Sequence, residues 1–84
     1  MPAPGGWFIC NVVGAGPDEN GNVVVRLTDA SGAFQDRWFD AVAISKREML
    51  ATALAAMTSG FKVNALLVST DQYSPLNRLY IWSN

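Results

Sequence analysis

The sequence predicts a small β-barrel with one helix, α+β by content, in the order β-β-β-α-β-β. Two observations lead to this prediction. Five segments are rich in β-branched and aromatic residues and are separated by turn residues, as strands are. One further segment, residues 45–60, carries apolar residues at helical spacing. Chain length fits a single domain spanning residues 1–84.

The first half of the chain predicts three strands. Residues 1–6 are rich in proline and glycine and are expected to form a flexible lead-in. In the third segment, Phe34, Asp36 and Trp38 alternate with Gln35, Arg37 and Phe39, which is the period of a strand. Clusters of turn residues divide the three segments. We therefore expect strands at residues 7–13, 23–28 and 33–39, joined by turns at 14–22 and 29–32.

The helix of residues 45–60 carries signals for both of its ends. Ser45 and Glu48 have the spacing of a capping box, in which each side chain accepts a hydrogen bond from the other residue's backbone N–H. Gly60 stands where a left-handed C-terminal cap is expected. The large apolar residues share one face at helical spacing. This face is formed by Met49, Leu50, Ala53, Leu54 and Met57.

Two more strands follow, at residues 61–69 and 76–82, with a loop at 70–75. In the first of these strands Phe61, Val63, Ala65 and Leu67 share one face, and in the last strand Leu79 and Ile81 do. Three antiparallel strands, a helix and two more strands form the order of the five-stranded OB-fold. The large apolar face of the helix is then expected to plug one end of the barrel.

The other face of the helix is small and uncharged, which points to assembly. An isolated small domain normally turns one charged helical face to water, and only 15% of this chain is charged. Apolar surface buried between subunits would account for both facts. The expected oligomer interface consists of Ala51, Thr52, Ala55, Ala56 and Ser59.

The second half of the chain resembles a known family. The helix, the segment Thr58–Val63, the following strand and loop, and Leu79–Ile81 are similar to the OB-fold B subunits of AB5 toxins, in particular the subtilase-cytotoxin and pertussis-like group. Small bacterial proteins share this pattern. The resemblance implies a ring of five subunits, with helices facing a central pore and sheets pairing edge to edge. It also implies a carbohydrate ligand, and a second polypeptide that docks on the ring.

Charge and composition narrow the possible partners. The net charge is −1 and the six basic residues are scattered, so the basic stripe of a nucleic-acid-binding protein is missing. No run is long enough to span a membrane. The N-terminal residues lack the pattern of a signal peptide, so the protein is expected in the cytoplasm, or outside the cell if a leader was omitted. Cys10 has no partner for an intrachain disulfide and is expected to be a small buried residue.

The chain lacks the usual parts of an enzyme. It has no histidine, the commonest general base at neutral pH, and a single cysteine. Gly14 and Gly16 form a lone G-x-G that we interpret as part of a hairpin turn. Asp18, Asn20 and Asn22 resemble the start of a calcium loop without its terminal acidic ligand, and are also interpreted as a turn. We expect no catalytic residues, no metal and no cofactor.

Aromatic residues give the best candidates for ligand contact. Alternation along the strands does not place all of the Trp and Tyr residues inside the barrel, and exposed rings stack on sugars or fill subunit interfaces. Binding residues also concentrate on loops held by a rigid scaffold, which favours Tyr73 and its neighbours. The candidate ligand-binding residues are Tyr73, Asp71, Gln72, Trp38 and Asp36.

Taken together, these features predict a non-enzymatic, ring-forming binding protein, a homopentamer with a carbohydrate ligand. Two alternatives stay open. OB-folds also bind single-stranded nucleic acid through stacking aromatics, although the missing basic groove makes this ligand the less favoured one. A purely structural oligomer without a small ligand is the other alternative.

Overall fold

A computed structural model describes residues 5–82 and shows five strands and a helix in the predicted order. A short 3₁₀ turn, η1, precedes the helix. The elements are β1 (Gly6–Pro17), β2 (Val23–Asp29), β3 (Arg37–Ala41), η1 (Ala43–Ser45), α1 (Lys46–Ser59), β4 (Lys62–Leu67) and β5 (Pro75–Trp82).

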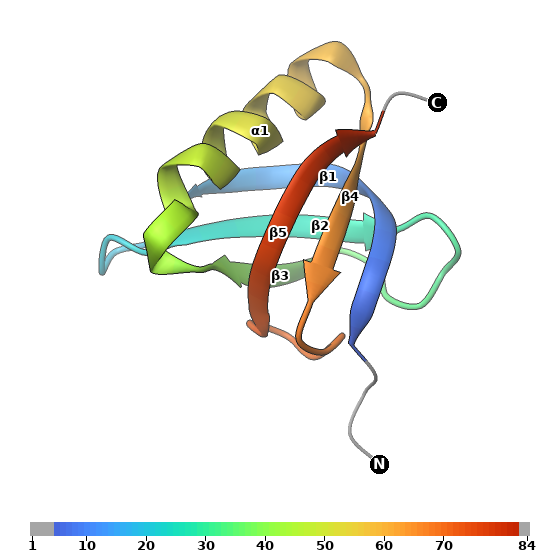
Figure 1. The fold of residues 1–84 in the computed structure, drawn as a ribbon, viewed down its shortest axis with the longest axis horizontal. Helices are drawn as coiled ribbons and strands as arrows, with labels where there is room; N and C mark the ends of the chain where they lie inside the picture. Colours follow the sequence, from blue (N-terminus) through green and yellow to red (C-terminus); the bar gives the residue numbers. More distant parts are fainter. Residues whose placement is uncertain (1–4, 83–84) are drawn as a thin grey trace.

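The strands close into a barrel in the order β1-β2-β3-β5-β4 (Figure 1). The long strand β1 pairs with β2 along one half and with β4 along the other, so it belongs to both sides of the barrel. Closure depends on a short parallel contact, in which Asp40 pairs with Pro75 and Ala41 with Leu76. Helix α1 follows β3 and packs mainly against β1 and β5. This arrangement is an OB-fold-like barrel, as the order of elements predicted.

The first hairpin differs from the sequence expectation. Gly14 and Gly16 lie inside β1, where a bulge between Val12 and Gly14 shifts the register with β2, so their assignment to a turn is wrong. A glycine in a strand often marks such a bulge. The turn itself is confined to 18–22, and the Asp18 carboxylate holds it by accepting the backbone N–H groups of Asn20 and Asn22, each at 2.9 Å.

The third strand begins later than predicted. Asp36 has a positive φ of 49°, which interrupts the extended backbone, and regular pairing with β2 begins at Arg37. Phe34 lies before this break yet is buried at 3% exposure, and Phe39 is buried within β3. The predicted alternation of residues 33–39 is therefore wrong, because the turn at Asp36 resets which side chains point inward.

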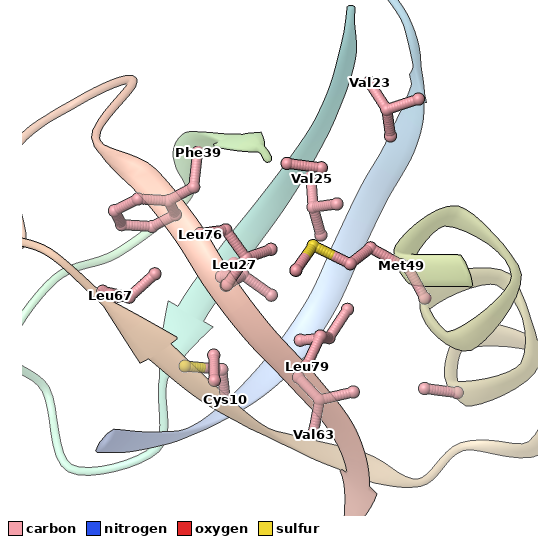
Figure 2. Packing of buried hydrophobic residues seen from close by; sticks show 14 of the residues in the cluster. Cys10, Val23, Val25, Leu27, Phe39, Met49, Val63, Leu67, Leu76 and Leu79 are labelled. Carbon is pink, nitrogen blue, oxygen red and sulfur yellow. The ribbon is translucent and has the colours of Figure 1, made fainter. Parts of the chain in front are cut away.

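The interior is built from apolar side chains on every strand and from α1 (Figure 2). Phe39, Leu27, Leu67 and Leu76 are the largest fully buried side chains. In β4 and β5 the inward residues Val63, Ala65, Leu67 and Leu79 are buried as predicted. Phe61 precedes β4 and is 47% exposed, and Ile81 near the end of β5 is 40% exposed, so these two residues do not join the core.

The helix ends at its predicted C-terminal cap but starts without the predicted capping box. Gly60 adopts the left-handed conformation at φ 77°, and its N–H donates to the Ala56 carbonyl at 2.9 Å. Ser45 is the N-cap residue, but its side chain caps no backbone N–H. The capping box is wrong because η1 runs directly into α1, and Ser45 sits between them at φ −128° and ψ 22° rather than in the extended conformation of a capping serine.

The face of α1 that plugs the barrel is rotated from the predicted one. Met49, Ala53 and Ala56 are the buried residues, at positions i, i+4 and i+7, and Leu50 packs beside them. Leu54 and Met57 were expected in the plug but are 47% and 43% exposed. Ala56 was expected on the interface side but is 1% exposed and belongs to the core. Ala56 thus takes part in the contact with the barrel that was expected of Leu54 and Met57, and its small side chain is compatible with a close approach of the helix.

Cys10 is completely buried in β1, as expected. Desolvation of the thiolate, with a smaller contribution from the nearby Asp29 carboxylate, raises the pKa of this thiol to about 12. The thiol therefore behaves as a small apolar core residue at neutral pH.

The predicted lead-in lies mostly outside the described residues. Only Gly5 and Gly6 of residues 1–6 are described, and Gly6 is the first residue of β1 rather than part of a lead-in. Within residues 5–82, no helix has the length and the apolar run that a membrane-crossing helix needs.

Candidate functional site

The outer surface of β1, β2 and β3 carries a row of three residues that lie side by side. Gly14 pairs with Arg26, and Arg26 pairs with Trp38 on the next strand. Because side chains alternate between the faces of a strand and Phe39 points into the core, its neighbour Trp38 points outward. The row therefore runs across the outside of the barrel wall.

The indole of Trp38 extends across this row toward β1. A Cβ atom added to Gly14 would lie 3.3 Å from Cη2 of Trp38 and 3.4 Å from Cβ of Arg26. The Arg26 guanidinium carbon lies 5.8 Å from the Trp38 ring centroid, within the range of a cation–π contact. The missing side chain at Gly14 thus leaves room for a large ring to lie over the sheet, flanked by one cation.

Asp36 stands beside this ring and is fixed by Thr28 of β2. The Thr28 hydroxyl donates to the Asp36 carboxylate, and the Asp36 N–H donates back to the same hydroxyl oxygen, both at 3.0 Å. Arg26 approaches the Asp36 carboxylate at 4.0 Å, with both side chains more than two-fifths exposed. A pair this exposed adds little stability, so its main consequence is that the Asp36 carboxylate lies next to the cation that contacts Trp38.

The loop between β4 and β5 runs along β3 and supplies the other side of the site. Trp38 donates its backbone N–H to the Gln72 side-chain oxygen at 2.9 Å, and Tyr73 donates its N–H to the Trp38 carbonyl at 2.7 Å. Arg37 anchors the same loop by donating to the Thr70 carbonyl. The Gln72 oxygen is occupied, which leaves its NH₂ group available as a donor.

Four of the five sequence-predicted residues meet here. Trp38, Asp36 and Gln72 are joined directly or through Thr28 and Arg26, and Tyr73 is tied to Trp38 through the backbone, with a side chain 55% exposed. Asp71 is the exception. Its backbone N–H donates to the Ser69 hydroxyl at 3.1 Å, and within residues 5–82 its carboxylate accepts no hydrogen bond. Asp71 is therefore exposed on the loop but is not part of the network around Trp38.

Sequence reasoning missed the contributions of Gly14, Arg26 and Thr28 to this site. Their place depends on register between strands, which the sequence does not reveal. The one usable signal was Gly14, because an isolated glycine inside a β-rich run often marks a bulge or a close approach of other groups. Tyr73 has φ 64°, an uncommon conformation for a residue other than glycine, and tight loops at binding sites often contain such residues.

The candidate site has the chemistry of a binding surface. It offers one large aromatic face, one cation, one carboxylate, a free amide donor and a tyrosine hydroxyl, all near the outside of the barrel. Within residues 5–82, no three acidic, cysteine or histidine side chains gather as metal ligands would. A comparison with known protein families, with curated proteins and with solved structures finds no match for this chain.

Proposed function

We propose that this chain is a non-enzymatic binding protein that forms a homopentameric ring and binds carbohydrate on the outer face of β2 and β3. The observation that carries the ligand is the Trp38 ring lying over Gly14 and beside Arg26, whose guanidinium in turn approaches the Asp36 carboxylate. The face of strands two and three and the loop between strands four and five are the surfaces with which OB-folds bind oligosaccharides and oligonucleotides.

The polar groups around Trp38 support a neutral, hydroxyl-rich ligand. A sugar ring stacks its C–H face on an indole, while carboxylate, guanidinium and amide groups bond to its hydroxyls. Asp36 accepts such bonds, and Arg26 and the Gln72 NH₂ donate them. The cation and the anion balance each other, so the site as a whole does not favour a charged ligand.

The exposed surface of α1 supports assembly. Beyond Glu48 the helix carries no charged residue, and Leu54 and Met57 are exposed together with Ala51, Ala55 and Ser59. Two residues of the predicted interface are left out, because Thr52 is half-buried and Ala56 belongs to the core. The proposed contact surface therefore consists of Ala51, Leu54, Ala55, Met57 and Ser59. Covering this uncharged surface in a ring would remove it from water.

The carbohydrate proposal is tested by glycan-array binding of the wild-type protein and of Trp38→Ala. Removing a stacking ring is expected to abolish any glycan signal. Trp82→Ala is the control at a second tryptophan, because Trp82 lies on β5; Trp38 is half-buried and Trp82 is exposed. A signal that survives Trp38→Ala, or the lack of any glycan signal in the wild type, would contradict the proposal.

A second candidate ligand is single-stranded nucleic acid, favoured by the Arg26–Trp38 contact. Bases stack on exposed aromatics, and arginine adds cation–π and phosphate contacts. Net charge of −1 leaves little counterion release to drive such binding. Fluorescence anisotropy with a short labelled oligonucleotide at low salt separates the two ligands, because tight, salt-sensitive binding lost in Trp38→Ala would place nucleic acid first.

The ring is tested separately by light scattering coupled to size-exclusion chromatography. The wild type is expected to elute as a pentamer at micromolar concentration. Ala55→Glu places a charge on the proposed contact surface and is expected to shift the protein to smaller species. Ser31→Glu, in the exposed turn after β2, is expected to leave the ring unchanged. A monomeric wild type would rule out the ring without affecting the ligand proposal.

A further inference from the structure

A groove lies between the start of α1 and β5, along the edge of β5 that faces away from β4. It has a volume of about 230 Å³. The helix contributes residues from its first two turns, and the strand contributes four successive residues. The lining residues are Ser45, Glu48, Met49, Thr52, Asn77, Arg78, Leu79 and Tyr80.

The strand wall of this groove is the edge of β5. Successive side chains of a strand point to opposite faces, so a wall formed by four consecutive residues, Asn77–Tyr80, consists of the strand's edge and its backbone. The pairing explains why this edge is bare. The neighbouring strand β3 pairs with β5 only at Pro75 and Leu76 and then turns away into η1. From Asn77 onward, β5 has a strand partner on the β4 side alone.

The backbone of this edge has unused hydrogen-bonding groups. In an antiparallel pair, alternate residues direct both N–H and C=O away from the partner strand. Within residues 5–82, the backbone of Asn77–Tyr80 forms no hydrogen bond outside the β4–β5 ladder. Asn77 is skipped by a register shift in the β4–β5 pairing, so the regular ladder covers Arg78–Tyr80. The edge is about 13 Å long for four residues at about 3.3 Å each, and alternate residues of its regular part present outward donors and acceptors.

The groove also has side chains that would position a bound strand. Met49 and Leu79 lie at the apolar floor of the groove, where only 4% and 6% of each residue is exposed. Glu48 on the helix wall and Arg78 on the strand wall are exposed and carry opposite charges, and within residues 5–82 neither takes part in an ion pair. A segment with a basic and an acidic side chain on the face opposite its apolar residues would place charges of both signs near Glu48 and Arg78.

We infer that this groove binds an extended segment of a partner protein, which adds to the barrel as a strand beside β5. Strand addition uses main-chain hydrogen bonds for affinity and alternate side chains for selectivity, and both features are present here. A second copy is a poorer fit. In each copy α1 lies beside the β5 edge (Figure 1). Direct pairing of two such edges would have to accommodate two helices, whereas a single extended segment has to fit between one helix and one strand. This inference is independent of the carbohydrate site.

The test uses a fluorescein-labelled, end-capped peptide, Thr-Val-Lys-Val-Thr-Val-Glu, titrated with the wild-type protein and followed by anisotropy. Alternate valines suit the apolar floor, and the lysine and glutamate suit Glu48 and Arg78. Two further peptides carry N-methyl groups on the valine amides or on the intervening amides. Since only every second amide of an added strand faces β5, one methylated peptide is expected to bind about tenfold more weakly while the other binds nearly as the parent does.

A variant pair locates the binding. Asn77→Trp places a large ring in the groove and is expected to weaken binding of the parent peptide at least about tenfold. Asn11→Trp, an exposed asparagine of β1, is the matched control and is expected to bind normally. Circular dichroism confirms that both variants fold.

Three outcomes overturn the inference. Equal binding of all three peptides would show that strand pairing is not involved. Binding unaffected by Asn77→Trp would place the peptide elsewhere. Lack of peptide binding up to millimolar concentration would also overturn it, and in that case self-association lost in Asn77→Trp would identify a second copy as the occupant.

Discussion

Replacing Ala56 with leucine is expected to destabilise the barrel, whereas the same replacement at the neighbouring Ala55 is not. The two residues have the same side chain and lie in the middle of the same uncharged helix segment. Ala56 is 1% exposed and packs in the core, while Ala55 is exposed. This pair therefore separates the effect of helix face from that of helix propensity, because the difference in intrinsic helix propensity between alanine and leucine is the same at both positions.

The magnitude follows from the close approach of α1 to the barrel. Ala53 and Ala56 are 0% and 1% exposed, so the larger side chain of a leucine at 56 is directed into the core, where we expect it to push the helix outward or adopt a strained rotamer. Overpacking of this kind costs about 1–3 kcal/mol. For a domain of this size a loss of about 2 kcal/mol lowers Tm by about 8–16 °C. Ala55→Leu, on the surface, is expected within about 0.5 kcal/mol of the wild type.

Thermal unfolding followed by far-ultraviolet circular dichroism measures both variants. It is repeated at two protein concentrations, because Ala55 belongs to the proposed ring surface and any effect through assembly changes with concentration. Thr58→Leu, at an exposed helix position outside the predicted interface set, provides a second surface control. Equal Tm values for Ala56→Leu and Ala55→Leu, or a larger loss at Ala55, would refute the observed helix orientation and restore the face predicted from the sequence.

Three further predictions follow from single contacts. Gly60→Ala is expected to lower the free energy of unfolding in urea by about 1–2 kcal/mol because φ is 77° there, although a Cβ would meet no atom within 4 Å. Gly16→Ala is the control, because Gly16 is equally open but has no positive φ. Equal losses of unfolding free energy in the two variants would contradict the backbone argument. Burial raises the pKa of Cys10 from 9.0 to about 12, so the unfolded chain ionises first and the stability due to Cys10 is present below pH 9 and is lost as the pH rises toward 12. Between pH 8 and pH 10.5, the free energy of unfolding in urea should therefore fall more for the wild type than for Cys10→Ala. Identical decreases would refute the raised pKa of Cys10. Arg37→Ala removes the hydrogen bond to the Thr70 carbonyl, which is worth about 1.5 kcal/mol for a charged donor. This change should speed hydrogen exchange of the Tyr73 amide about tenfold. Arg47→Ala, at an exposed position of α1, should leave that exchange unchanged.

The order of elements was accessible from the sequence because it depends on local signals. Runs of β-branched residues, turn residues such as those around Asp18, and the glycine at position 60 each report on a few neighbouring residues. These signals gave five strands and one helix with the correct C-terminal cap. The candidate ligand residues on the loop around Tyr73 were also accessible, because polar and aromatic residues between strands point to an exposed loop.

The predicted boundaries and inward faces of strands and helix were wrong where one residue changed the local geometry. The positive φ of Asp36 reset the alternation of residues 33–39, and the η1 turn removed the capping role of Ser45. Hydrophobicity alone favoured the larger apolar residues of the helix as the plug of the barrel. The barrel keeps Met49 and Ala53 from the predicted face and adds Ala56, because close packing of a helix on a sheet depends on the space available between them.

By itself, the sequence determined the type and order of the elements, the burial of Cys10 and the uncharged character of the helix beyond its first turn. Only the tertiary structure decided which residues meet. Strand register brings Gly14, Arg26 and Trp38 into one row, and the early end of the β3–β5 pairing leaves an edge of β5 bare beside α1. The physical reason is that register and helix rotation are set by packing between segments distant in the chain, whereas propensity and capping are set by neighbours along it.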